Sequence, residues 1–376
     1  MKAARKSEVV VITGAGAGVG RATVREFARS GSRIGLIGRD RARLEQAAAE
    51  VRHLGGQAIV CAADVAEAAQ VEAAAAAVEA AFGSFDVWVN NAMATIYSPF
   101  SEISPKDYKR ATEVTYLGTV YGTMAAIKRM KKRDQGVIVQ VGSALAYRAI
   151  PLQAPYCAAK FAIRGFTDAV RSELLHDRSK VRLTMVQMPA LNTPQFDWGK
   201  NQMSMRPQPV SPIFQPETAA KAIFWAAHHK RREVYVCWPS LRTIWANKFI
   251  PGLLDYYLAH FSYTGRQSGQ KADPARPDNL WQPVGGMDFA AHGRFDSRAR
   301  QGGIGLWATL YRGPIAAGLL CTAALAARTF RRRNTGRGKG LARVKITDPE
   351  NRTHAQFTGK QHNGRQPRLQ AGRWPG

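Results

Sequence analysis

The chain has 376 residues, of which 54 are Lys or Arg and 27 are Asp or Glu, giving a formal net charge of +27. Hydrophobic residues make up 45% of the sequence and charged residues 22%, which excludes wholesale disorder and collagen-like structure. The four cysteines are widely spaced and form no cluster with zinc-ligand spacing, so we expect neither a disulfide framework nor a metal site. No apolar segment separates the basic N-terminus from the first predicted strand, which argues against a secretory signal and for a cytoplasmic location.

The first 240 residues alternate short apolar runs with helical patterns. The runs predict buried strands at 9–12, 34–37, 58–62, 86–89, 137–141, 181–187 and 233–236. Helices are predicted at 20–30, 40–53, 65–82, 104–133, 155–176 and 217–229. Strands joined through helices form parallel sheets that are covered on both faces. We therefore predict an α/β fold, a doubly wound Rossmann-type parallel sheet that binds ligands at the carboxyl ends of its strands, followed by an irregular or helical C-terminal extension.

A glycine-rich loop joins the first predicted strand to the first helix. Its residues that we expect to contact a cofactor are Thr13, Gly14, Gly16, Gly18, Val19 and Gly20. Glycines let the backbone turn tightly and approach a pyrophosphate, which then lies at the helix N-terminus. A purely structural turn is the alternative, but the position between a strand and a helix favours dinucleotide binding.

The second strand ends without the acid that would bind the ribose of NAD, because Gly38 stands there and Arg39 follows. A guanidinium at this point suits the additional phosphate of NADP, and a solvated charge at a helix start is the alternative. Asp64, after the third strand, is a candidate for hydrogen bonding to the adenine amine. It could equally cap the next helix.

Ser143, Tyr156 and Lys160 form a candidate catalytic set. Ser143 follows the fifth strand, and Tyr156 and Lys160 are four residues apart, so they share one face of a predicted helix. An ammonium beside a phenol favours the phenolate and should lower a pKa that starts near ~10. Such a tyrosine can exchange a proton with a carbonyl or hydroxyl group, and Ser143 can hydrogen-bond the same oxygen.

Together these features make residues 7–240 similar to the short-chain dehydrogenase/reductase family. The matching motifs are Thr13-Gly14-x-x-x-Gly18-x-Gly20, Asp64-Val65, Asn90-Asn91-Ala92, Ser143, Tyr156-x-x-x-Lys160 and Pro189-x-x-x-Thr193. The resemblance implies NAD(P) binding and carbonyl/alcohol redox chemistry. It implies Tyr156 as acid/base, Lys160 as the residue that tunes it and binds the nicotinamide ribose, and Ser143 as the substrate-orienting residue. It also implies cofactor contacts from Asp64, Val65, Asn91, Pro189 and Thr193, and a homo-oligomer paired through the helices at 104–133 and 155–176.

Three positions depart from the family pattern. Met93 replaces the last glycine of Asn-Asn-Ala-Gly, which would strain the backbone if a positive φ were required. Thr115 stands where many members have the asparagine of a water-mediated proton relay, so we expect its hydroxyl to hold that water. Ala190 replaces the glycine of a Pro-Gly pair. None of these changes removes Tyr156 or Lys160.

Beyond residue 240 the family gives no guidance. We predict a catalytic domain over 1–240, an extension that wraps it over 241–304, an apolar helix over 305–330 and a basic disordered tail over 331–376. Phe196, Trp198, Met203 and Met205 could form an apolar lid over the substrate or simply pack in the core. The uncharged stretch 313–327 could anchor the chain in a membrane. The alternatives are a helix that is buried in the protein or self-associates, and a helix that lies at the membrane interface.

The leading functional prediction is an NADP-preferring oxidoreductase, with NAD as the other cofactor considered, acting on a carbonyl or secondary alcohol of a small and apolar substrate. The alternative is a cofactor-binding scaffold or redox sensor at the membrane with little turnover. The tail from Arg328 onward holds 13 Lys and Arg against two acids, a net charge of +11. Contact with an anionic membrane surface is the favoured interpretation of this charge over nucleic-acid binding, and a solvated tail without a specific partner is the other alternative.

Overall fold

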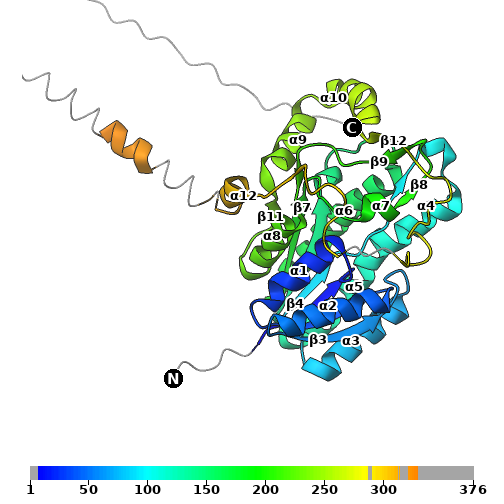
Figure 1. Cartoon of the computed structure of the whole chain (residues 1–376). Coiled ribbons are helices and arrows are strands. Elements are labelled where there is room, and N and C mark those ends of the chain that lie inside the picture. Colours follow the sequence, from blue (N-terminus) through cyan, green and yellow to red (C-terminus); the bar gives the residue numbers. More distant parts are fainter. Residues whose placement is uncertain (1–6, 287–289, 312, 314–320, 329–376) are drawn as a thin grey trace, which may run out of the picture. The chain divides into compact units, whose positions relative to one another are not determined.

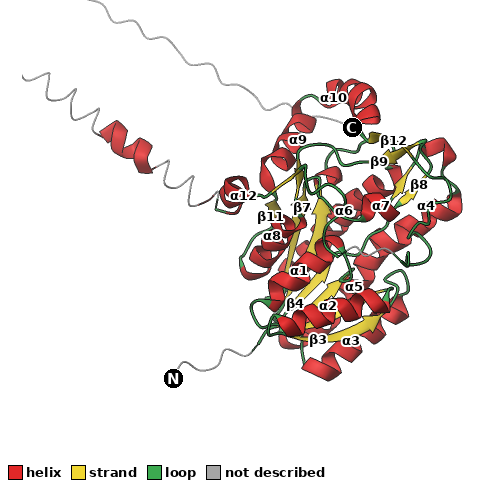
Figure 2. Cartoon of the chain, in the orientation of Figure 1, coloured by secondary structure: helices red, strands yellow, loops and turns green. Residues whose placement is uncertain are grey.

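The computed structural model describes residues 7–286, 290–311, 313 and 321–328. Residues Met1–Ala317 group into one compact unit and Gly318–Gly376 into a second. The first unit is built on a seven-stranded sheet in the order β11-β7-β6-β4-β1-β2-β3 (Figures 1 and 2). Every neighbouring pair of these strands is parallel, so the α/β architecture predicted from the alternating pattern is confirmed.

The strands of the large sheet coincide with the seven apolar runs. They are β1 (Val9–Thr13), β2 (Arg33–Gly38), β3 (Gln57–Ala62), β4 (Val87–Asn90), β6 (Val137–Ser143), β7 (Arg182–Met188) and β11 (Glu233–Tyr235). Every residue of β1, β4 and β6 is buried. Strands that are covered on both faces need apolar, mostly β-branched side chains throughout, which is why they stand out in the sequence.

Helices cover both faces of the sheet. One face packs against α1 (Gly18–Ala28), α2 (Arg41–His53) and α8 (Pro216–His228), and the other against α3 (Ala68–Phe82), α5 (Gly118–Met130) and α6 (Ala154–His176). Side chains of β1 alternate between these two cores: Val10 and Ile12 belong to the first, and Val9 and Val11 to the second. Because the connections run to opposite sides of β1, a crevice forms between the carboxyl ends of β1 and β4.

The long helix predicted at 104–133 is divided. Its parts are α4 (Pro105–Thr112), the π-helical turn η2 (Glu113–Leu117), α5 and the 3₁₀ turn η3 (Lys131–Arg133). Ser104 caps α4, because its hydroxyl accepts a hydrogen bond of 3.1 Å from the amide of Asp107. The π turn carries Thr115, and such turns often lie at functional sites.

The C-terminal extension packs on the sheet domain through several short elements. They are α9 (Cys237–Phe249), α10 (Pro251–Tyr257), η5 (Leu258–Ser262), α11 (Tyr263–Gly265), β12 (Gln267–Lys271), β13 (Ala299–Arg300) and α12 (Gly303–Leu310). Leu280 is fully buried in one core of the sheet domain, and Leu306 and Leu310 are buried in the other. The extension therefore shares the hydrophobic cores of the first unit.

Several small elements lie between β4 and β11, and some of them pair with the extension. They are β5 (Ile96–Tyr97), η1 (Phe100–Glu102), η4 (Ala144–Ala146), α7 (Gln195–Trp198), β8 (Lys200–Asn201), β9 (Met205–Pro207) and β10 (Ile213–Phe214). The antiparallel pair β12–β9 and the parallel pair β13–β10 tie the extension to the segment after β7. The predicted domain limits at 240, 304 and 330 stay predictions.

The predicted membrane segment falls largely outside the described residues, since 314–320 and 329 onward are not described. Residues 321–328 are helical, and α12 ends at Leu310. Among the helices that the structure does describe, none combines the length and the apolar character needed to cross a bilayer.

Candidate active site

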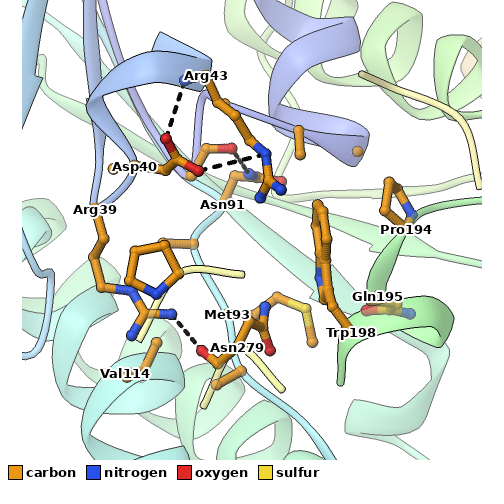
Figure 3. Close-up of a pocket in the computed structure, with 18 of the residues that line it drawn as sticks. Arg39, Asp40, Arg43, Asn91, Met93, Val114, Pro194, Gln195, Trp198 and Asn279 are labelled. Carbon is orange, nitrogen blue, oxygen red and sulfur yellow. Dashed lines mark hydrogen bonds and ion pairs between the residues drawn. The ribbon is translucent and has the colours of Figure 1, made fainter. Parts of the chain in front are cut away.

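A cavity of about 210 Å³ occupies the crevice beside the glycine-rich loop. Predicted cofactor residues that line it are Gly14, Gly16, Gly18, Val19, Arg39, Asp64, Val65, Asn91 and Thr193. Further lining residues, for which the sequence predicts no cofactor contact, are Arg43, Gln195, Trp198, Asn279, Pro283 and Val284. In Figure 3 the side chain of Trp198 lies across the cavity from Arg39 and Asp40, and a dashed line joins Arg39 to Asn279.

The glycine loop has the backbone geometry of a phosphate cradle. Gly14 and Gly18 have φ values of +66° and +57°, which a residue with a Cβ adopts only with strain. A Cβ on Gly20 would lie 2.0 Å from the carbonyl oxygen of Gly14, so the first turn of α1 can approach the loop only without a side chain. A dinucleotide pyrophosphate fits a cradle that is kept open in this way at a helix N-terminus.

Asn91 fixes the loop from the neighbouring strand β4. Its side-chain amide donates to the carbonyls of Thr13, at 3.0 Å, and Gly14, at 3.3 Å. The hydroxyl of Thr13 accepts from the amides of Asn91 and Ala92 at 2.9 and 3.1 Å. Thr13 and Asn91 thereby join the ends of β1 and β4, and Asn91 also lines the cavity.

Arg39 is held by the C-terminal extension. Its guanidinium donates to the carbonyls of Trp281, at 2.9 Å, Leu280, at 3.3 Å, and Asn279. Asp40 accepts from the amide of Arg43 at 3.1 Å and so caps α2. The sequence predicts a cation at this point, but it does not predict that a segment some 240 residues later supplies acceptors for it.

The extension also reaches the glycine loop itself. The amide of Gly18 donates to the carbonyl of Ala290 at 2.9 Å, and Arg43 donates to the carbonyl of Val284 at 2.6 Å. We refer to residues 279–286 and 290–295 as the strap. Its carbonyls accept hydrogen bonds from Gly18 of the glycine loop and from Arg39 and Arg43 beside it. No motif marks the strap in the sequence, because its contacts with Arg39, Arg43 and Gly18 use backbone oxygens that any residue provides.

Asp64 lies at the far end of the cavity, after β3. It accepts from the amide of Ala66 at 3.0 Å and forms an ion pair with Arg110. Arg110 in turn donates to the carbonyl of Leu280 at 3.2 Å, so the strap and Asp64 share one cation. Helix α3 begins later than predicted, at Ala68, and its N-cap residue is Glu67. The capping alternative for Asp64 is therefore wrong.

Ser143, Tyr156 and Lys160 come together at the carboxyl end of β6. Ser143 is the last residue of β6, and Tyr156 and Lys160 lie in the first two turns of α6. A hydrogen bond joins Tyr156 to Ser143, and the ammonium of Lys160 lies 5.5 Å from the centroid of the Tyr156 ring. This ammonium donates to the carbonyl of Val141 at 2.7 Å and is buried.

The predicted lowering of the Tyr156 pKa is not observed. Burial raises the pKa of Tyr156 to about 12, although the hydrogen bond from Ser143 acts in the opposite direction. Burial also lowers the pKa of Lys160 to about 8. The expectation fails because desolvation of the phenol outweighs the hydrogen bond from Ser143 and the charge of Arg266, which both favour the phenolate. A phenol in this state is a proton donor at neutral pH.

Thr115 and Met93 show how the family departures are accommodated. The Thr115 hydroxyl makes two bonds of 3.0 Å with the backbone of Ala94, one to its carbonyl and one from its amide. The Thr115 carbonyl accepts from the Thr119 hydroxyl at 2.9 Å. Met93 lines the cavity and has no positive φ, so its side chain strains nothing there. The relay role of Thr115 stays a prediction.

The remaining predicted residues divide between the cavity and the core. Thr193 lines the cavity, whereas Pro189 directly follows β7 and does not. Among the proposed lid residues, Trp198 lines the cavity, while Phe196 and Met203 are buried in a cluster with Tyr97. Packing therefore accounts for Phe196 and Met203. The cavity thus combines the glycine loop with residues that follow β3, β4 and β7, whereas Ser143, Tyr156 and Lys160 are not among its lining residues.

Comparison with known proteins agrees with this arrangement. A family model described as short chain dehydrogenase matches residues 8–202. The uncharacterised oxidoreductase YxnA of Bacillus subtilis is 30% identical over 284 residues, 75% of this chain and 80% of the relative. The 3-dehydrosphinganine reductase of Danio rerio is 31% identical over 222 residues, 57% of this chain and 66% of the relative.

Solved structures show the same fold. An alcohol dehydrogenase from the archaeon Thermococcus sibiricus, complexed with 5-hydroxy-NADP, is 26% identical with a TM-score of 0.53. The match covers 61% of this chain and 95% of that structure. The family model spans more than half of the sequence, and the bacterial relative matches along most of its own length. The chain therefore belongs to the short-chain dehydrogenase family of oxidoreductases.

Proposed function

We propose that this chain is a nicotinamide-dependent oxidoreductase that interconverts a carbonyl group and a secondary alcohol, with Tyr156 as the acid/base residue. The observation that carries the proposal is the convergence of Ser143, Tyr156 and Lys160 at the end of β6, two strands away from the glycine loop on β1. The cavity and the Cβ-free cradle at Gly14 and Gly20 fit a dinucleotide.

In this proposal the glycine loop, Val65, Asn91, Pro189 and Thr193 hold the cofactor, and a reduced nicotinamide supplies a hydride when bound. Tyr156 donates its phenolic proton to the carbonyl oxygen as the alcohol forms, and solvent returns that proton. Ser143 holds the same oxygen by a hydrogen bond, and Lys160 binds the nicotinamide ribose. Burial raises the pKa of Tyr156 to about 12, so the phenol is protonated at neutral pH and can donate its proton in the reduction step.

The test replaces Tyr156 by Phe and measures oxidation of NADPH with a panel of ketones, aldehydes and quinones. We expect turnover to fall about 100-fold or more, because the proton donor is lost, while cofactor binding measured by calorimetry is retained. Tyr256→Phe is the matched control, since this tyrosine is 72% exposed on α10. Turnover that is equal in Tyr156→Phe and the wild type would refute the role of Tyr156.

For the cofactor we propose a preference for NADP. The support is Arg39 beside the cavity, the glycine at position 38 where an acid would favour NAD, and the presence of 5-hydroxy-NADP in the archaeal relative. Asp64 would bind the adenine amine. Arg39 would exchange its neutral carbonyl partners for a phosphate, a stronger acceptor because the hydrogen bond is then assisted by two charges.

The second candidate function is a cofactor-binding scaffold or redox sensor with slow turnover. It is favoured by Thr115, whose hydroxyl and carbonyl are both engaged within the protein. A water that relays protons to Lys160 would then lack the support that the family asparagine gives. Cofactor binding without turnover on the whole substrate panel would select this function.

We also propose contact with an anionic membrane surface. Helices α9 and α10 and the turn η5 expose large apolar side chains, which are Trp238, Trp245, Phe249, Ile250, Leu253, Tyr256, Tyr257 and Phe261. Arg242 and Lys248 are exposed on the same α9. Aromatic side chains combined with cations are the usual composition of helices that lie at a membrane interface.

A further inference from the structure

Arg266 of the extension is buried near the candidate catalytic tyrosine. It lies between α11 and β12, and its backbone is fixed by hydrogen bonds with Ser262, at 3.2 Å, and Gln208, at 2.9 Å. Its side chain is only 5% exposed, and it donates through Nη2 to the side-chain carbonyl of Gln153. The guanidinium lies 5.8 Å from the centroid of the Tyr97 ring.

No acid within ion-pair distance of Arg266 is found among the residues that the structure describes. The ionisable groups that interact with it are Tyr97, Cys157 and Tyr156, all of which are neutral at pH 7. Burying a cation without an anion is unfavourable, and proteins normally pair such a group. Other buried arginines of this chain follow that rule: Arg21 binds Glu50 and Arg129 binds Glu72 and Glu79.

Within the described part of the chain, two polar atoms of this cluster have no hydrogen-bond partner. They are Nε of Arg266 and the hydroxyl of Tyr97, whose side chain is fully buried. Both are donors, and buried donors are almost always satisfied. A carboxylate offers two acceptor oxygens, matches the planar fork of a guanidinium and supplies the missing negative charge. A carboxylate that reaches both atoms would satisfy both orphan donors.

The same cluster is connected to the active site. Gln153, which holds Arg266, precedes Tyr156 by three residues and donates to the Thr95 hydroxyl at 2.9 Å. Thr95 lines the cofactor cavity. The charge of Arg266 also acts on the phenol of Tyr156, where it favours the ionised form. A substrate whose carbonyl lies at Tyr156 would thus have its other end beside Arg266.

We propose that Arg266, with the Tyr97 hydroxyl, binds a carboxylate on the substrate, so that the substrates are oxo acids rather than neutral ketones. This inference rests on the proposed function for its redox step. It places the substrate-selecting cation in the extension, outside the residues that match the family model.

The first test measures binding to the cofactor-free protein by calorimetry, with pentanoate as the probe and pentanamide as its neutral control. We expect the wild type to bind pentanoate about tenfold more tightly than the amide, and Arg266→Gln to bind both equally. Lys271→Gln is the matched control: it removes one positive charge from an exposed position on adjacent β12 and should keep the preference. Equal binding of acid and amide by the wild type overturns the inference, even if Arg266→Gln does not fold.

The second test compares kcat/KM for 4-oxopentanoate and 5-oxohexanoate with the values for their methyl esters. We expect the wild type to favour an acid about tenfold or more, chiefly through KM, and Arg266→Gln to lose that preference while it still reduces the esters. Arg266→Lys should recover part of the preference, because it restores the charge without the fork. Equal reduction of acids and esters by the wild type overturns the inference and leaves the proposed function standing.

Absence of all reduction despite cofactor binding contradicts the proposed function, and the calorimetry then decides on Arg266 alone.

Discussion

Arg39 bonds to the strap in the structure, and in our proposal it binds a phosphate of NADP instead. Three strap carbonyls accept from it. Hydrogen bonds to a charged partner contribute about 1.5–3 kcal/mol, and about 1.4 kcal/mol corresponds to tenfold in affinity. We therefore expect Arg39→Ser to weaken NADPH binding about tenfold or more and to change NADH binding little.

Fluorescence titration of both cofactors checks this expectation. Arg41→Ser is the matched control, because its side chain is 67% exposed and makes only a 3.9 Å ion pair with Glu45. If Arg39→Ser weakens NADH as much as NADPH, then Arg39 supports the site through the strap and does not select the cofactor. Equal affinities in the wild type would remove the NADP preference.

Lys160 predicts a particular dependence of stability on pH. Its pKa falls from 10.5 in the unfolded chain to about 8 when folded, because burial disfavours the ammonium. Between pH 8 and 10.5 the Lys160 side chain is neutral in the folded state and protonated in the unfolded state. The free energy of unfolding therefore rises with pH across this range. The stability that Lys160 contributes is complete above about pH 10.5 and is lost as the pH falls through 8.

Urea unfolding of the cofactor-free wild type and of Lys160→Met, at pH values from 7 to 10, tests this sign. One pKa unit corresponds to about 1.4 kcal/mol, so the stability of the wild type relative to the variant should rise by about 2–3 kcal/mol between pH 8 and 10. Titration of other groups cancels in the difference. A difference that stays flat or falls with pH would mean that the buried ammonium keeps its ordinary proton affinity.

Residues with a fixed spacing were predictable from the sequence, and residues that depend on distant packing were not. The glycines at 14, 18 and 20 are required by local backbone geometry, so a pattern reveals them. Lys160 was predicted to act on the Tyr156 pKa, but the sign of the net shift depends on burial, which spacing does not report. Arg266 carries no signal at all, because a lone arginine is ordinarily a surface residue.

Helix α7 is the point at which arginines of the extension and of β9 bind the sheet domain. Buried Asp197 accepts from Arg206 at 3.1 Å and from Arg294 of the strap. Arg276 donates to the backbone carbonyls of Asp197 and Gly199, both at 2.6 Å. Segments far apart in the chain therefore share one acidic residue, and the strap is positioned over the cofactor cavity by an ion-pair network.

Removal of this acid should loosen the strap. We expect Asp197→Asn to lower the free energy of unfolding by about 2 kcal/mol, less than for a fully buried pair because Arg206 and Arg294 are partly exposed and can regain water. Chemical denaturation measures this loss. Asp273→Asn, on an exposed loop of the same extension, should change stability by less than about 0.5 kcal/mol. Equal stability of the two variants would show that the ion pairs contribute nothing net.

The seven strands of the sheet were predictable because each holds a short, mostly apolar stretch between helices. The short pairs β5–β8, β9–β12 and β10–β13 were not predictable, since they have two to five residues and no alternation. Two of these pairs depend on packing of the extension, and β5–β8 depends on packing between two loops of the sheet domain. The π turn around Thr115 was missed for a related reason: a single inserted residue leaves helical periodicity almost unchanged.

Across the whole chain the positive charge is uneven, and this asymmetry bears on the proposed membrane contact. Residues 328–376 hold 13 Lys and Arg against two acids, whereas the exposed aromatic side chains lie on α9, α10 and η5 in the first unit. Each basic residue near an anionic bilayer contributes about 1 kcal/mol at most, and salt screens this attraction. The exposed aromatic side chains would contribute to membrane binding by apolar burial, which should depend little on salt.

The two contributions can be separated by sedimentation with phospholipid vesicles. We expect the full chain to bind vesicles rich in phosphatidylserine at about 50 mM salt, and to lose most of this binding at about 300 mM. A chain that ends at Ala317, the limit of the first compact unit, should bind more weakly and with little dependence on salt. Trp245→Ser in that shorter chain should weaken the residual binding, since this side chain is 59% exposed on α9. Equal sedimentation with neutral and anionic vesicles would exclude the basic residues as the source of attraction, and sedimentation with neither would refute the membrane proposal.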